Sequence, residues 1–284
     1  LSSGGLVWSG NARPIPQVRA GFIDFVDIPF TKGWVQIKGE LAYGKFMDND
    51  FLRDHYNYYN QYITTDALYH HKSISFRSNP DKPFVVTIGA ELAAQFGGTK
   101  RYYEKGILID SLTMKSPTRL KDFFKILFPS SGDGQTNEGD QAYYYGNHVG
   151  QWNLSAEYRF KDNSSVRGYF EWYFDDASGM GKFNGWDGLW GLEYKSGKKN
   201  WLSNVVLEYL DMTNQSGPLN WCPSDYNDPK LDIEATGADD YYNNYFYNGW
   251  AHYGLSNGTA MAKSLLYNTD GYMRYKHNRI RGVH

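Results

Sequence analysis

Two glutamates are the first candidates for chemistry in this chain, because each lies near the middle of a segment with alternating hydrophobicity. Glu157 and Glu171 fall on the polar faces of adjacent segments, which places them on one side of a predicted hairpin. Paired carboxylates of this kind perform acid and base chemistry in glycoside hydrolases. Arg159 and Arg167 share that face, however, and alternating acids and bases also form charge ladders in a barrel lumen. A lumen charge ladder is the favoured interpretation, with a glycan-cleaving pair as the alternative.

Other side chains that commonly carry catalysis have no supporting context. The chain has no Gly-x-Ser-x-Gly motif and no phosphate-binding loop, and Cys222 is its single cysteine. The histidines form no HExxH pair. The acidic segment 222–240 lacks EF-hand spacing, which favours a solvated loop over a calcium site. We therefore expect no enzyme activity, no metal and no cofactor.

Aromatic side chains next to amides and carboxylates are a stronger functional signal. Flat rings stack on the C–H faces of sugars, while neighbouring polar groups bind the hydroxyls. Such residues lie outside the alternating segments and favour a polysaccharide-binding site, although each is also typical of a girdle or plug. The predicted polysaccharide-binding residues are Trp186, Asp187, Trp221, Tyr242, Asn243, Trp250 and His252.

Alternation with a period of two identifies the strands that must position these side chains. In segment 151–160, apolar and polar residues alternate without exception, and the pattern resumes after a polar turn. Its length of ten residues matches the roughly 9 to 11 that a tilted strand needs to cross a bilayer. The predicted strands are 34–41, 84–93, 151–160, 166–175, 188–195 and 201–210.

These strands suit either a transmembrane barrel or a soluble sandwich, because both have one apolar face. Aromatic residues at the strand ends, such as Trp152 and Phe160, favour the barrel with its two aromatic girdles. A mean hydropathy of −0.63 is compatible with a barrel, whose lumen side is polar. The sequence therefore predicts an all-β fold, a large antiparallel transmembrane β-barrel formed by residues 1–284 as a single domain.

One segment departs from this pattern. Residues 116–128 begin with Ser-Pro and then repeat apolar side chains at helical spacing, which predicts a short amphipathic helix. A helix of this length cannot span a bilayer. We expect it to pack on the barrel mouth, and the alternative is a position in the membrane interface.

Charge and chain ends add two expectations. The formal net charge is −2, so no basic field indicates nucleic acid as a partner. The sequence starts at Leu1 without a secretion signal and stops at His284 in mid-pattern. We therefore expect a fragment of a longer protein.

A family resemblance rests on six short motifs in order. They are Tyr143–Asn153, Asp187–Gly191, Gln215–Pro218, Tyr241–Asn244, Gly249–Trp250 and Asn278–Ile280. Together they resemble the capsule-assembly Wzi family of bacterial outer-membrane proteins, in the form found in Bacteroidetes. The resemblance implies a closed barrel with a periplasmic helical element, acting without catalysis as a lectin that helps attach capsular polysaccharide to the cell surface. Implied partners are surface polysaccharide, outer-membrane lipid and other capsule-export proteins. An outer-membrane porin or substrate channel with the same wall is the alternative.

Overall fold

The computed structural model describes residues 4–10, 12–55, 60–137, 140–141, 144–181, 184–198, 201–217 and 239–284. Trp221 and Cys222, together with most of the acidic segment 222–240, lie outside the described residues. Within the described part, no helix is both long and apolar enough to cross a membrane.

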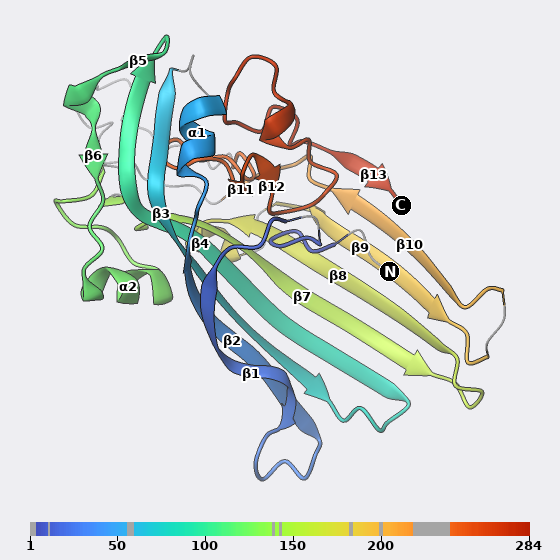
Figure 1. Cartoon of the computed structure of the whole chain (residues 1–284). Coiled ribbons are helices and arrows are strands. Elements are labelled where there is room, and N and C mark those ends of the chain that lie inside the picture. The colour runs from blue at the N-terminus through green and yellow to red at the C-terminus, as the bar shows by residue number, and fades with distance from the viewer. Residues whose placement is uncertain are drawn as a thin grey trace.

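A single antiparallel sheet forms most of the molecule (Figure 1). Its strands follow chain order up to β10, so neighbours in sequence are also neighbours in space. The main strands are β1 (Gln17–Asp27), β2 (Val35–Lys45), β3 (Gln61–Ser78), β4 (Phe84–Glu104), β7 (Asn147–Arg159), β8 (Ser165–Asp175), β9 (Gly188–Lys195), β10 (Asn204–Asp211) and β13 (Arg281–Val283). The short strands β5 (Ile107–Leu108) and β6 (Met114–Lys115) pair with β4, and β11 (Ala251–His252) and β12 (Leu255–Ser256) form a separate pair. The helices are α1 (Asn49–His55), α2 (Leu120–Leu127) and the 3₁₀ turns η1 (Asp110–Leu112), η2 (Ala177–Met180) and η4 (Leu265–Tyr267).

The all-β prediction is confirmed, whereas closure into a barrel is not observed. The two edge strands, β1 and β13, do not pair with each other within the described residues, so the sheet is open there. All six predicted strands are present; the long strands β1 and β3 and the short strands β5, β6, β11, β12 and β13 are additional.

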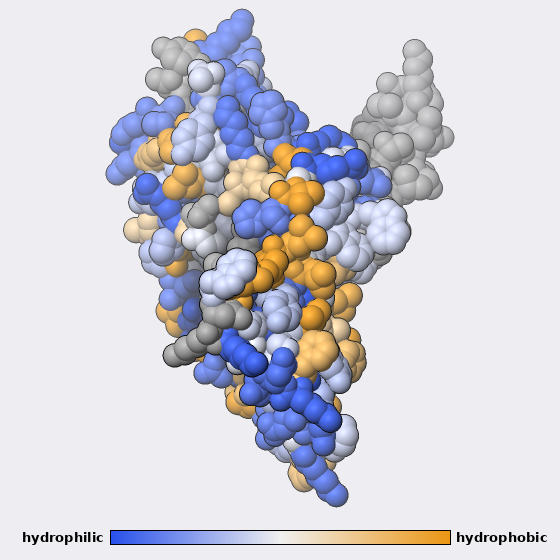
Figure 2. All heavy atoms as spheres, turned by 90° about the vertical axis from the view of Figure 1, so that its right-hand side faces the viewer, coloured by the Kyte–Doolittle hydropathy of each residue, from blue (hydrophilic) through white to orange (hydrophobic). Residues whose placement is uncertain are grey.

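The two faces of the sheet have opposite chemistry. We call the face that carries Leu154 and Phe170 the outer face, and the face that carries Gln151 and Glu171 the inner face. Apolar side chains meet on the outer face across six strands, where Leu154 is 42% exposed and Leu207 is 56% exposed. One continuous cross-strand row of the outer face is Phe76, Ile88, Leu154, Phe170, Trp190 and Tyr209. In Figure 2, hydrophobic residues gather over the middle of the molecule, with hydrophilic residues above and below.

The two ends of the sheet differ in the length of their connections. At one end, the turn end, the hairpins β1–β2, β3–β4, β7–β8 and β9–β10 close over short stretches of chain (Figure 1, lower edge). At the other end, the loop end, the connections are long and contain α1, α2 and the strands β5 and β6.

A buried core covers the inner face at the loop end. It is formed by the described residues 4–10, 12–16 and 239–280, and we call them together the inner plug. The backbone N–H groups of Leu6 and Val7 both donate to Gln151 Oε1 at 3.0 Å, which ties the plug to β7. Trp250, with no exposed surface, packs in the same core.

The predicted amphipathic helix corresponds to α2, which is shorter than the segment 116–128. The Phe123 ring lies 5.3 Å from the Tyr43 ring and 5.2 Å from the Phe96 ring, so α2 docks on the sheet at the loop end. Ile126 is fully buried in the same contact, whereas Leu120 is 76% exposed and Phe124 is 55% exposed.

Candidate functional site

Two predicted polysaccharide contacts lie inside the plug. Trp250 Nε1 donates to the carbonyl of Val7 at 2.7 Å. The Tyr242 hydroxyl donates to the carbonyl of Leu6 at 2.6 Å and accepts from the N–H of Thr259 at 3.2 Å. Burial raises the pKa of Tyr242 above its ordinary value, so the hydroxyl stays protonated. Neither ring offers a face on which a sugar could stack, because both are completely enclosed.

Asp187 binds loop backbone and side-chain groups of the protein itself, so its carboxylate is not free to bind a ligand. Its carboxylate accepts from the backbone N–H groups of Asn214 at 3.0 Å and Gln215 at 2.8 Å. It also accepts from the Tyr241 hydroxyl at 3.0 Å. Three hydrogen bonds to a buried carboxylate hold the connection after β10 against the plug.

His252 joins the plug to the connection that follows β2. Its Nε2 lies 3.3 Å from the backbone nitrogen of Met47, which donates to it. Burial lowers the pKa of His252, and the neighbouring Asp48 carboxylate opposes that shift. A neutral imidazole that accepts from a backbone N–H is a structural element of this junction.

Trp186 is exposed but faces away from the others. Its side chain is 75% exposed, and its ring lies 5.6 Å from the ring of Trp190 on the outer face. The Trp190 Nε1 group donates to the Trp186 carbonyl at 3.2 Å. Trp186 therefore extends the outer-face aromatics, and the predicted residues within the described chain do not converge on one pocket.

The predicted charge ladder is partly present on the inner face. Arg159 Nε lies 2.7 Å from Glu157 Oε1, and Arg167 Nη1 lies 3.7 Å from Glu193 Oε2. Glu157 stands opposite Arg167 across β7 and β8, whereas Glu171 accepts from the N–H of Leu6 at 3.2 Å.

The same register argues against a glycosidase pair. Glu171 lies four positions along β8 from Arg167, the partner of Glu157. At a rise of about 3.3 Å per residue this separates the two carboxylates by roughly 13 Å. Glycoside hydrolases hold their two carboxyl groups about 5 to 9.5 Å apart. The geometry thus favours the ladder.

A pocket that the sequence did not single out lies beside Asn243 at the loop end. It encloses about 320 Å³ between the start of β3 and two plug segments. Tyr245 is 66% exposed there, and its ring lies 5.6 Å from the Tyr62 ring. The lining residues are Asn60, Gln61, Tyr62, Asp240, Asn243, Asn244, Tyr245, Tyr247, Tyr272, Met273 and Arg274. We call this the tyrosine-amide pocket.

Internal hydrogen bonds fix the wall of this pocket. Asn243 Nδ2 donates to the Tyr275 carbonyl at 2.9 Å, and Asn243 Oδ1 accepts from the Tyr275 N–H at 2.8 Å. Asn244 Oδ1 accepts from the N–H groups of Phe246 and Tyr247. Asn243 is therefore a wall residue whose amide is already engaged.

The rim of the pocket is charged. Arg274 Nη2 lies 2.8 Å from Asp240 Oδ2, and the two side chains are 64% and 44% exposed. A neighbouring groove of about 680 Å³ continues past this ion pair, and Lys276, His277 and Arg279 also line it. Exposed tyrosine, amides and ion-pair groups along one surface provide both stacking and hydrogen bonding.

Comparisons with protein-family models, curated proteins and solved structures were made for the whole chain. None of the three gives a match.

The sequence indicated part of the tyrosine-amide pocket, through Asn243, but did not indicate Tyr245. The run that begins Tyr241-Tyr242-Asn243-Asn244 continues to Tyr245, and its residues change from buried at the first two positions to exposed at Tyr245. Composition marked the run, but only the path of the loop determines which of its rings reach solvent.

Proposed function

We propose that this chain forms part of the wall of an outer-membrane β-barrel that binds a surface polysaccharide at its loop end without cleaving it. The observation that carries the proposal is the distribution of side chains across the sheet. Apolar residues are exposed on the outer face, and charged residues line the inner face. In a soluble sandwich, by contrast, a second layer of protein must cover the apolar face of the sheet.

The exposed apolar side chains of the outer face would be unfavourable in contact with water. Its apolar row runs over β3, β4 and β7 to β10, and contiguous patches of this extent mark contact with membrane or protein. Closure into a barrel, which removes free sheet edges, belongs to this proposal.

The two ends of the sheet support an orientation. Outer-membrane barrels have short turns on the periplasmic side and long loops outside the cell. In that orientation the tyrosine-amide pocket faces the cell surface, where polysaccharide is available. The resemblance to the Wzi family supports the same partner, and other capsule-export proteins are proposed as further partners.

The inner plug disfavours the alternative of an open porin. It packs Trp250, Tyr242 and Leu6 against the inner face, where a porin needs water. Large ion conductance in planar bilayers would support the porin instead.

Binding is tested with purified capsular polysaccharide and the chain reconstituted in bilayers. Tyr245→Ala should weaken binding about fivefold, because one exposed aromatic contact contributes about 1 kcal/mol. Tyr267→Ala is the matched control, since Tyr267 is 59% exposed but does not line the pocket. Equal affinity of Tyr245→Ala and wild type would contradict the proposed pocket, and new reducing ends would contradict binding without cleavage.

Membrane location is tested separately by fractionation. The protein should partition with membranes and migrate faster on gels before heating than after. Recovery in the soluble fraction would refute the barrel wall.

A further inference from the structure

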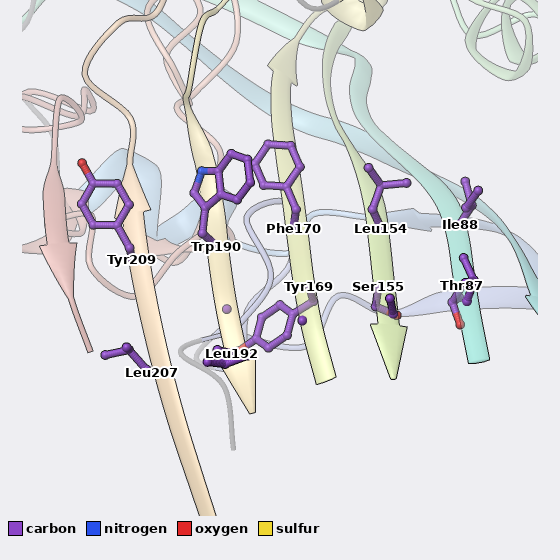
Figure 3. A pocket seen from close by; sticks show the side chains of 14 residues that line it. Thr87, Ile88, Leu154, Ser155, Tyr169, Phe170, Trp190, Leu192, Leu207 and Tyr209 are labelled. Carbon is purple, nitrogen blue, oxygen red and sulfur yellow. The ribbon is translucent and has the colours of Figure 1, made fainter. Parts of the chain in front are cut away.

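An apolar hollow interrupts the outer face. It encloses about 650 Å³ and crosses β4 and β7 to β10. Figure 3 shows Trp190, Phe170, Leu154 and Ile88, which belong to its lining, side by side on consecutive strands. The Phe170 and Trp190 rings stack with centroids 3.9 Å apart. Gly168 lies in its lining, and a Cβ there would meet no atom within 4 Å, so the missing side chain leaves open space.

A second hollow lies at the turn end of the same strands. It encloses about 970 Å³ and is lined by the turns β3–β4 and β7–β8 together with Tyr158 and Tyr194. Tyr158 follows Ala156 on β7, and Tyr194 follows Leu192 on β9, each by one strand period. Since Ala156 and Leu192 line the first hollow, the two hollows succeed each other along one face.

The second hollow contains cations that no carboxylate neutralises directly. Lys82 and Lys161 line it together with Asp81 and Asp162, and within the described residues neither ammonium group forms an ion pair. The Lys82 ammonium lies 5.5 Å from the ring of Trp34. The Asp162 carboxylate hydrogen-bonds within its own turn instead of pairing with either lysine, because it accepts from the Ser164 N–H at 3.0 Å and from its hydroxyl at 2.6 Å.

We propose that these two hollows bind one anionic glycerophospholipid, with an acyl chain along the outer-face hollow and the phosphate beside Lys82 and Lys161. This inference rests on the proposed membrane location. An acyl chain gains little by leaving other acyl chains, because lipid tails are as apolar as the hollow. Selection among lipids must therefore come from the head group, where an ammonium group favours a phosphate with net negative charge.

The test uses the chain inserted into phosphatidylcholine bilayers that contain trace spin-labelled phosphatidylglycerol or phosphatidylcholine. Electron paramagnetic resonance measures the fraction of each label that the protein immobilises. Wild type should select phosphatidylglycerol, and Lys82→Gln and Lys161→Gln should each reduce that selectivity about fivefold. Gly168→Leu fills the apolar hollow and should reduce the number of immobilised lipids.

A matched control separates a site from a general charge effect. Lys32→Gln removes the same charge from the β1–β2 turn, outside both hollows, and should leave selectivity unchanged. Equal losses in Lys32→Gln and Lys161→Gln would overturn the site. Insertion without any selectivity would also overturn it while leaving the proposed function in place. Failure of the chain to insert would overturn both proposals.

Discussion

Replacement of Trp250 by Phe distinguishes a structural role from a ligand contact. The indole N–H donates to the Val7 carbonyl at 2.7 Å inside a fully buried core. Phe keeps most of the apolar volume but leaves that carbonyl without its donor. A buried acceptor left without a partner costs about 1 to 3 kcal/mol, so we expect a loss of about 2 kcal/mol in the local stability of the plug.

This loss should be visible at the segment that Trp250 holds. The amides of Leu6 and Val7 are protected by bonds to Gln151, so their hydrogen exchange reports on detachment of residues 4–10. A change of 2 kcal/mol corresponds to roughly 30-fold faster exchange. Hydrogen–deuterium exchange with mass spectrometry of the bilayer-embedded chain measures this directly.

The control and the refuting result are both specific. Trp186→Phe changes an exposed ring and should leave exchange of residues 4–10 unaltered. Polysaccharide affinity should be unchanged in Trp250→Phe. Unchanged exchange together with weaker polysaccharide binding would show that Trp250 contacts the ligand and would refute its structural role.

Three further predictions concern stability. Gly191→Ala should lower the midpoint of unfolding in denaturant, because its Cβ would stand 2.0 Å from the Tyr169 ring, whereas Gly168→Ala meets open space and should be tolerated. Asp187→Ala should cost about 3 kcal/mol in denaturant unfolding by leaving its three donors unpaired, and Asp187→Asn should cost less. Burial raises the pKa of Asp239 to about 6, so the folded state holds this proton more tightly than the unfolded chain. The free energy of unfolding should therefore fall as the pH rises from about 4 to 6, and the Asp239→Asn variant should show a flatter pH profile.

Strand positions could be predicted from the sequence where all outer-face side chains of a strand are apolar. Segment 151–160 alternates strictly because its outer side chains are all apolar, and β7 occupies that stretch. In β3 the alternation fails, because His70 and Lys72 lie on the outer face at the loop end. His70 Nδ1 lies 3.1 Å from the Ala42 carbonyl, and Lys72 Nζ donates to the Ile126 carbonyl at 3.2 Å. A docked helix thus replaces the apolar surroundings on which the pattern depends.

The candidate site was harder to predict, because composition does not distinguish a buried ring from an exposed one. Tyr242 and Tyr245 are three positions apart in the same run, yet Tyr242 is enclosed and Tyr245 is exposed. Contacts with Leu6, far away in the sequence, decide the first case. No local pattern contains that information.

The inner plug also constrains the order in which the chain can fold. Leu6 and Val7 bond to Tyr242 and Trp250 across sequence separations of 236 and 243 residues. Closing so long a loop is entropically unfavourable until most of the sheet has formed. Leu6 and Val7 must therefore wait for Tyr242 and Trp250, which makes seating of this segment a late step in folding.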